Sequence, residues 1–185
     1  MENHNAYESS CVQEVMGDTL RPGGFKLTDT GVQYCRLSSG DTVLDLGCGR
    51  GATVNYLYQK YRIAAVGIDP SEKLIEEAKA SYPFASFLLG KGEQLPFIEE
   101  CFDAVFAECT LSLMDRLDSV IQQVYGVLKE KGWFFITDVY AKNPEASIQL
   151  GSYSINSCMR GLHDLDALCK KLEQAGFFIV HWEDY

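Results

Sequence analysis

The chain has 185 residues, enough for one domain with a sizeable core, and its 46% hydrophobic and 23% charged residues are typical of a globular rather than a disordered protein. Sixteen Lys and Arg against 26 Asp and Glu give a net charge of −10, which disfavours binding of nucleic acid because phosphates need cationic contacts. No apolar run approaches the roughly 20 residues that span a bilayer, and the polar N-terminus is no signal peptide, so we expect a cytoplasmic protein without a membrane span.

Cysteine usage excludes two further classes. The seven cysteines are odd in number and form no CxxC pair, which argues against a disulfide framework and against a zinc site. We therefore expect no metal. Most of these cysteines are expected to be small buried hydrophobic residues of a reducing compartment.

The first 40 residues are expected to be irregular or helical, with a break at the sequence RPGG (residues 21–24). We treat residues 1–40 as an N-terminal helical or lid segment and residues 41–185 as the ligand-binding domain. The glycine-rich stretch 20–30 is either a lid hinged at its two glycines or a turn between two helices.

From residue 41 onward, short apolar runs alternate with stretches of helical periodicity. Strands are expected at 42–46, 64–69, 87–89, 102–107, 133–139 and 177–182. Helices are expected at 53–61, from a cap at residue 71, at 119–129 and at 164–175. This alternation predicts an α/β fold with a doubly wound, mostly parallel sheet.

The loop after the first strand reads Asp45-Leu46-Gly47-Cys48-Gly49-Arg50-Gly51. Glycines at alternate positions allow a tight turn and a close approach of backbone to a ligand. The GxGxG spacing and the preceding acid disfavour an NAD enzyme, because the acid would repel a pyrophosphate. The same acid suits a cationic amino-acid ligand. A glycine turn without any ligand is the alternative.

A second acid, Asp69, stands at the end of the second strand. A carboxylate there can accept hydrogen bonds from both hydroxyls of a ribose. Read alone, Asp69-Pro70-Ser71 is equally compatible with a helix N-cap. Together with the glycine loop, it favours a nucleoside ligand.

Five motifs in order, VLDLGCGRG, VGIDPS, GKGEQLPF, FDAVFAECTLSL and VLKEKGWFFITD, resemble those of class I S-adenosylmethionine-dependent methyltransferases, with the ubiquinone/menaquinone and arsenite branches nearest. The resemblance covers roughly residues 41–182. It implies a Rossmann-like fold with S-adenosylmethionine as cofactor and S-adenosylhomocysteine as product.

The resemblance also implies the residues of the cofactor site. The glycine loop would pack against the methionine part, Asp45 would lie near its ammonium group, and Asp69 would hold the ribose. The full set is Asp45, Gly47, Cys48, Gly49, Gly51, Asp69, Pro70, Gly92, Glu93, Glu108 and Cys109. Lys91 departs from the family, which usually has an acid there for the adenine amino group, so that contact falls to Glu93 or to backbone carbonyls.

Methyl transfer to a small-molecule acceptor by in-line displacement is the predicted activity. Asp138, Cys158 and His163 are the catalytic candidates, although Asp138 and His163 also suit structural roles. The segment 156–161 around Cys158 resembles the Cys-x-x-Gly segment of arsenite methyltransferases, which makes metalloid methylation an alternative. The other thiols of that family have no clear counterparts, and a soft-metal site needs several thiolates.

A non-catalytic module that binds S-adenosylmethionine is the remaining alternative. We expect a monomer or a homodimer with a small-molecule substrate as its partner. The family closes its sheet with a seventh strand, for which three residues after position 182 leave no room. Truncation after Tyr185, a covering partner chain or an early end of the fold would each explain this.

Overall fold

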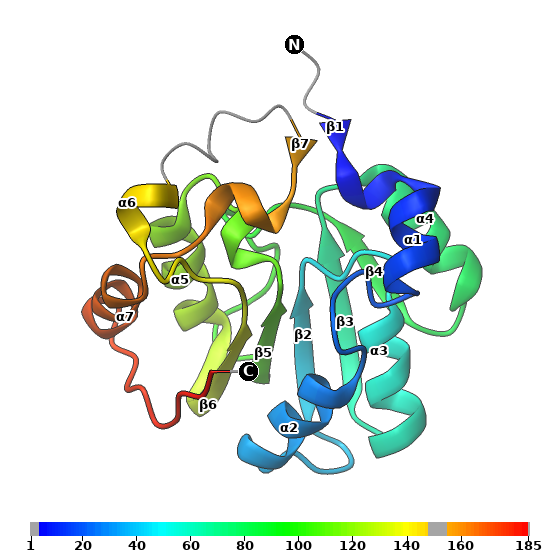
Figure 1. Cartoon of the computed structure of the whole chain (residues 1–185). Helices are drawn as coiled ribbons and strands as arrows, with labels where there is room; N and C mark the ends of the chain where they lie inside the picture. The colour runs from blue at the N-terminus through cyan, green and yellow to red at the C-terminus, as the bar shows by residue number, and fades with distance from the viewer. Residues whose placement is uncertain (1–3, 148–154, 185) are drawn as a thin grey trace.

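The computed structural model describes residues 4–147 and 155–184. Within them, five parallel strands form one sheet in the order β4-β3-β2-β5-β6 (Figure 1). The strands are β2 (Thr42–Leu46), β3 (Ala64–Asp69), β4 (Ser86–Leu89), β5 (Phe102–Glu108) and β6 (Leu128–Thr137). The predicted α/β class is confirmed, since the sheet is parallel and helices cover it.

Strand order determines where a ligand can bind. β2 lies in the centre and pairs with β3 on one side and with β5 on the other. The chain therefore leaves β2 towards β3 and β4 first, and only later fills the other half of the sheet with β5 and β6. Such a reversal opens a crevice at the carboxyl ends of the central strands.

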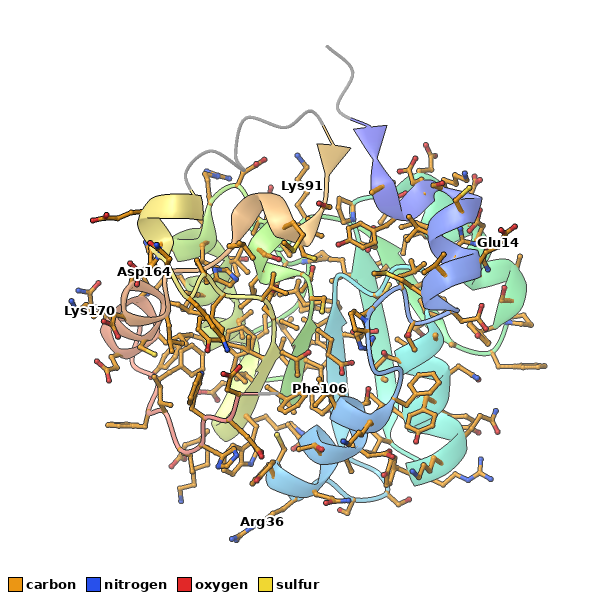
Figure 2. All side chains as sticks on the ribbon, viewed as in Figure 1. Glu14, Arg36, Lys91, Phe106, Asp164 and Lys170 are labelled. Carbon is orange, nitrogen blue, oxygen red and sulfur yellow. The ribbon has the colours of Figure 1, made fainter. Side chains whose placement is uncertain are left out.

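Helices pack on both faces of the sheet. One face carries α2 (Lys26–Tyr34), α3 (Ala52–Tyr56), which continues as a π-helical turn (Leu57–Tyr61), and α4 (Glu72–Ser81). The other face carries α5 (Leu117–Val127) and α7 (Leu165–Gln174). Figure 2 shows Phe106 inside the molecule, where it is fully buried, whereas Arg36 and Lys170 point outward.

The N-terminal residues cross the carboxyl end of the sheet. They form β1 (His4–Asn5), a 3-10 turn (Ala6–Glu8) and α1 (Ser10–Met16). β1 pairs in parallel with β7 (Ile155–Asn156), which precedes a second 3-10 turn, η5 (Cys158–Gly161). The start of the chain thus meets β7 at the end of the sheet where the crevice lies (Figure 1). A short helix, α6 (Pro144–Ser147), and the 3-10 turn η3 (Leu111–Leu113) complete the described elements.

The prediction of a sixth strand at 177–182 is wrong. Residues 177–184 form neither helix nor strand, and Phe178 is 91% exposed. Phe177 packs against α5 and α7, His181 stacks on Tyr34, and Trp182 meets Tyr140 edge to face. Individual side-chain contacts hold this segment in place. Its apolar residues therefore pack against the domain without forming a strand of the sheet.

One boundary also differs. The helix expected at 119–129 is α5, which ends at Val127, and β6 begins at Leu128 rather than at residue 133. The residues between the expected helix and the expected strand belong to β6. Phe102 pairs with Leu128, and the register shifts before Ala104 pairs with Trp133. No helix in the described part of the chain is long and apolar enough to cross a membrane.

Candidate functional site

A cavity of about 130 Å³ lies at the carboxyl ends of β2, β3 and β5. Both the N-terminal segment and the sheet line it. The lining residues include Tyr7, Leu20, Arg21, Asp45, Gly47, Cys48, Gly49, Thr53, Asp69, Pro70, Glu108, Cys109, Thr110, Leu113 and Met114. Most of the cofactor residues expected from the sequence are therefore brought together.

The glycine loop is shaped by steric limits. Gly47 and Gly51 have φ values of 76° and 79°, a region that L side chains rarely adopt. A Cβ on Gly47 would overlap the Thr110 side chain, and one on Gly51 would overlap the Phe87 ring. The loop closes by hydrogen bonds from the Gly47 and Cys48 amides to the Ile68 carbonyl, at 2.8 and 3.0 Å. These glycines therefore let the loop pack closely against Thr110, just after β5, and against Phe87 of β4.

Asp69 holds the glycine loop and the start of α4 together. Its Oδ2 accepts a hydrogen bond from the Gly49 amide and its Oδ1 accepts one from the Ser71 amide, both at 2.9 Å. Ser71 in turn caps α4 by accepting from the Leu74 amide at 3.2 Å. Burial raises the pKa of Asp69, against these two backbone hydrogen bonds. Each carboxylate oxygen keeps a lone pair for a ligand hydroxyl.

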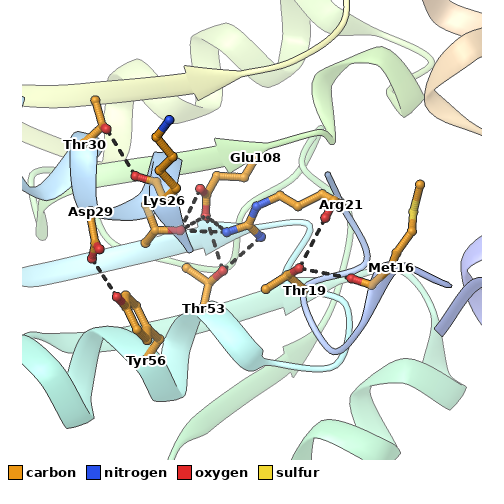
Figure 3. Close-up of polar contacts among 10 residues, drawn as sticks. Met16, Thr19, Arg21, Lys26, Asp29, Thr30, Thr53, Tyr56 and Glu108 are labelled. Atoms are coloured by element: carbon orange, nitrogen blue, oxygen red, sulfur yellow. Dashed lines mark hydrogen bonds and ion pairs between the residues drawn. The ribbon is translucent and has the colours of Figure 1, made fainter. Parts of the chain in front are cut away.

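A buried ion pair forms part of the cavity wall, because both of its residues line the cavity. Arg21 Nη2 lies 2.8 Å from Glu108 Oε2, and the two side chains are 6% and 1% exposed. Thr28 and Thr53 bridge the pair, because each hydroxyl accepts from the guanidinium and donates to the carboxylate. Figure 3 shows Thr53 beside Arg21 and Glu108. Burial raises the pKa of Glu108, while Arg21 and the two hydroxyls act in the opposite direction.

Six buried side-chain polar atoms in the described part of the chain lack a hydrogen-bond partner, and two of them belong to residues at the cavity. These two are Asp45 Oδ2 and Arg21 Nε. Burial and the nearby charge of Glu108 raise the pKa of Asp45 to about 8. Buried polar groups normally have partners, so these two atoms indicate a ligand with a cationic and an anionic end. The α-ammonium and α-carboxylate of an amino acid fit this arrangement.

Sequence reasoning missed Arg21 as a binding residue. The RPGG break was read only as a lid or a turn. The structure shows that this segment sends its arginine into the cavity. The available signal was an arginine followed by a proline and two glycines, but nothing in the sequence connects Arg21 to Glu108.

Cys109 is held at the cavity in an unusual backbone conformation. Its φ is 56°, in the left-handed region, and its amide donates to the Thr137 carbonyl at 2.6 Å. Non-glycine residues in this region often mark functional sites. Burial, with the charges of Asp138 and Cys158, raises the pKa of the Cys109 thiol to about 12, so the thiol is neutral.

The three catalytic candidates lie beside the cavity rather than among its lining residues. Asp138 accepts from the Ser112 amide and hydroxyl at 3.0 and 2.7 Å, and His163 Nε2 lies 3.6 Å from it. Burial raises the pKa of Asp138, but the nearby His163 and hydrogen bonds from Ser112 and the Val139 amide outweigh it and hold the pKa below its usual value. Cys158 reaches the cavity only through Tyr7, to whose hydroxyl its amide donates at 3.1 Å.

Gly92 and Glu93 also lie outside the set of lining residues. Gly92 is buried, and a Cβ there would stand 3.2 Å from Leu46 and 3.3 Å from Met114, which itself lines the cavity. Lys91 is exposed at the edge where the strands end (Figure 2). No group of three or more metal-ligating side chains occurs within residues 4–147 and 155–184.

Comparison with known proteins identifies the family and the fold of the chain. A family model described as a methyltransferase domain matches residues 44–136. A methyltransferase of Synechocystis sp. is 36% identical over 171 residues, which span 88% of this chain and 79% of the relative. The arsenite methyltransferase of Halobacterium salinarum is 28% identical over 80% of this chain and 40% of its own length.

A solved structure shares the fold. Phosphoethanolamine N-methyltransferase 2 of Haemonchus contortus, in complex with phosphomonomethylethanolamine and S-adenosylhomocysteine, superposes with a TM-score of 0.77 at 18% identity. The match covers 90% of this chain and 40% of the Haemonchus chain. The present chain therefore spans about two fifths of the Halobacterium and Haemonchus proteins.

Proposed function

We propose that this chain, which belongs to the class I S-adenosylmethionine-dependent methyltransferases, binds its cofactor in the cavity at the ends of β2, β3 and β5 and methylates a small-molecule acceptor there. The family match and the Synechocystis relative support the enzyme class. The cofactor's place in this chain and the kind of acceptor are inferences from the site.

The observation that carries the proposal is the pair of unpaired buried atoms, Asp45 Oδ2 and Arg21 Nε. Asp45 would take the ammonium of the methionine part and Arg21 its carboxylate. Asp69 would accept the ribose hydroxyls through the free lone pairs of its oxygens. These three side chains fit the amino-acid and ribose ends of one ligand.

The chemistry is a displacement at the methyl carbon. A lone pair of the acceptor forms the new bond to that carbon while the carbon–sulfur bond breaks, and S-adenosylhomocysteine leaves with the bonding electrons. The cofactor supplies an activated methyl group, so the protein contributes orientation and exclusion of water, which are worth roughly 7–11 kcal/mol. An acceptor that carries a proton on its nucleophilic atom loses it to solvent or to a base.

Calorimetric titration with S-adenosylhomocysteine tests the cofactor site. Asp69→Ala should weaken binding about 10- to 150-fold, because hydrogen bonds to a charged group are worth about 1.5–3 kcal/mol. Asp103→Asn is the matched control: Asp103 contacts Lys129 and Thr42 at the opposite end of the sheet, so this variant should bind normally. Equal affinity in Asp69→Ala would overturn the assignment, as would binding of NAD.

Turnover separates an enzyme from a module that only binds. The purified protein, S-adenosylmethionine and a dialysed metabolite extract should produce S-adenosylhomocysteine, and Asp45→Asn should abolish that production. Binding without product formation across extracts would favour the module.

Metalloid methylation is the second candidate, favoured by two thiols, that of Cys109 in the cavity lining and that of Cys158 beside the cavity. The charge of Cys158 raises the pKa of the Cys109 thiol, and both cysteines raise the pKa of Tyr7, so the three side chains lie close together. Arsenite with glutathione is the probe. Formation of methylarsenic that is lost in both Cys109→Ser and Cys158→Ser would support this function, and full activity in either variant would contradict it.

A further inference from the structure

A strap of residues 4–8 lies across the carboxyl end of the sheet and is anchored on both sides. On one side, His4 and Asn5 pair with Ile155 and Asn156. On the other side, Ser71 donates to Glu8 Oε1 at 2.8 Å and Lys73 donates to the Glu8 carbonyl at 2.7 Å. The strap thus joins the start of α4 to the segment that contains Cys158.

Tyr7, in the middle of the strap, lines the cavity. Its hydroxyl accepts the Cys158 amide at 3.1 Å, so the ring reaches from the strap to η5. Burial and hydrogen bonding to the Cys158 thiol raise the pKa of Tyr7 well above its usual range. The phenol is therefore neutral, as is the thiol of Cys109 nearby.

This end of the cavity is unfavourable for an anion. Among the lining side chains that the structure describes, Arg21 is the one cation; it is paired with Glu108, and the proposed function assigns its remaining donor to the carboxylate of the cofactor. The Asp138 carboxylate lies close enough to Cys109 to affect its ionisation. Leu113 and Met114 make the remaining wall apolar. A negatively charged group would meet carboxylates and neutral groups without a free positive charge.

We propose that the acceptor subsite is the end of the cavity between Tyr7 and Cys109, that Tyr7 roofs it, and that it takes a small acceptor without negative charge. This inference rests on the proposed function, because it assigns the other end of the cavity to the cofactor. It excludes phosphorylated and carboxylate acceptors.

Thiol-reactive methanethiosulfonates of similar size and opposite charge test the subsite without a known acceptor. The rates at which the trimethylammonium and the sulfonate reagents modify Cys109 are measured by mass spectrometry at pH 9. Each rate is divided by that of Cys11, which is exposed. We expect the anionic reagent to react at least 10-fold more slowly than the cationic one. Equal rates, or faster reaction of the anion, would overturn the charge assignment.

The rates at which Cys109 is modified also test whether Tyr7 covers the subsite. Tyr7→Ala should raise the rate at Cys109 at least 10-fold with both reagents and keep their ratio, whereas Tyr7→Phe, which keeps the ring, should stay within 3-fold of the parent. Tyr58→Ala removes a half-exposed tyrosine outside the lining set and is the matched control. An unchanged rate in Tyr7→Ala would show that Tyr7 does not cover the subsite.

Two further measurements distinguish a wrong subsite from general unfolding and from a wrong proposed function. Cys35 is buried in the core and should stay unmodified in every variant, which excludes general unfolding. Calorimetry with S-adenosylhomocysteine reports the cofactor site independently. Normal binding with equal reagent rates would overturn the subsite alone, whereas loss of binding in the unmodified protein would overturn the proposed function.

Discussion

Arg21 and Glu108 come from opposite sides of the glycine loop in the sequence and meet in an ion pair with almost no exposure to solvent. Thr28 and Thr53 complete the contact, so four segments converge on one pair of charges. The pair orients the guanidinium so that Arg21 lines the cavity, and it anchors the N-terminal segment to β5.

Breaking this pair should be costly. Arg21→Ala leaves a buried carboxylate without its cation, and we expect a loss of about 3–5 kcal/mol in the free energy of unfolding. Urea denaturation provides the measurement. Lys171→Ala, which breaks a solvent-exposed pair with Asp118, is the control and should cost less than about 1 kcal/mol. Comparable losses in the two variants would show that Arg21 and Glu108 are not paired in solution.

We expect the buried Asp45 carboxyl to lower the free energy of unfolding as the pH rises. Its pKa of about 8, against an ordinary 3.8, means that the folded state holds a proton that the unfolded state releases between these values. Stability contributed by this proton is therefore lost as pH rises from about 4 to 8. Asp45→Asn should be more stable than the parent by about 1–3 kcal/mol at pH 8, and equal to it near pH 4. Urea titrations at four pH values would show a constant difference if the carboxyl is normal.

Asp138 should behave in the opposite way. Its pKa is held below the ordinary value, so its contribution is present above pH 4 and is lost as pH falls through the lower folded value. Asp138→Asn should cost about 1–3 kcal/mol at pH 7, with the difference vanishing in acid. Cofactor affinity should not change, because Asp138 is not a lining residue. Lost turnover in a variant of normal stability would instead make it catalytic.

The left-handed backbone at Cys109 predicts that glycine is tolerated at this position at least as well as alanine. A left-handed residue with a Cβ is strained by roughly 1–2 kcal/mol, which glycine avoids. Cys109→Gly should therefore be at least as stable as Cys109→Ala in thermal unfolding. At Ala78, which lies buried in α4, glycine should cost the usual destabilisation. A less stable Cys109→Gly would mean that the φ of 56° is not kept in solution.

Much of the fold could be predicted because local signals coincide with the tertiary arrangement. The run at 42–46 is buried and ends in glycines, and it is β2 with the same bounds. Ser71 was expected to cap a helix, and its hydroxyl accepts the Leu74 amide. The glycine loop and Asp69 were found because close approach and a strand-end carboxylate leave a direct trace in the sequence.

The remaining features depend on contacts between distant segments. Phe177 and Ile179 give an apolar run like that of a strand, but pairing depends on a neighbour that the run itself does not specify. Arg21 was missed for a related reason, because its role arises only when β5 brings Glu108 beneath it. The boundary at Leu128 was missed because a turn can be drawn into a strand by pairing with Phe102.

The strap over the cavity also bears on the rate of turnover. At about 130 Å³ the cavity is smaller than the roughly 300–1,000 Å³ typical of ligand sites, so we expect the covering segments to separate when a nucleoside enters or leaves. That separation breaks the β1–β7 pairing and the contacts of Glu8. Release of product, rather than transfer of the methyl group, is then expected to limit the cycle, and a burst of the first turnover would precede a slower steady state.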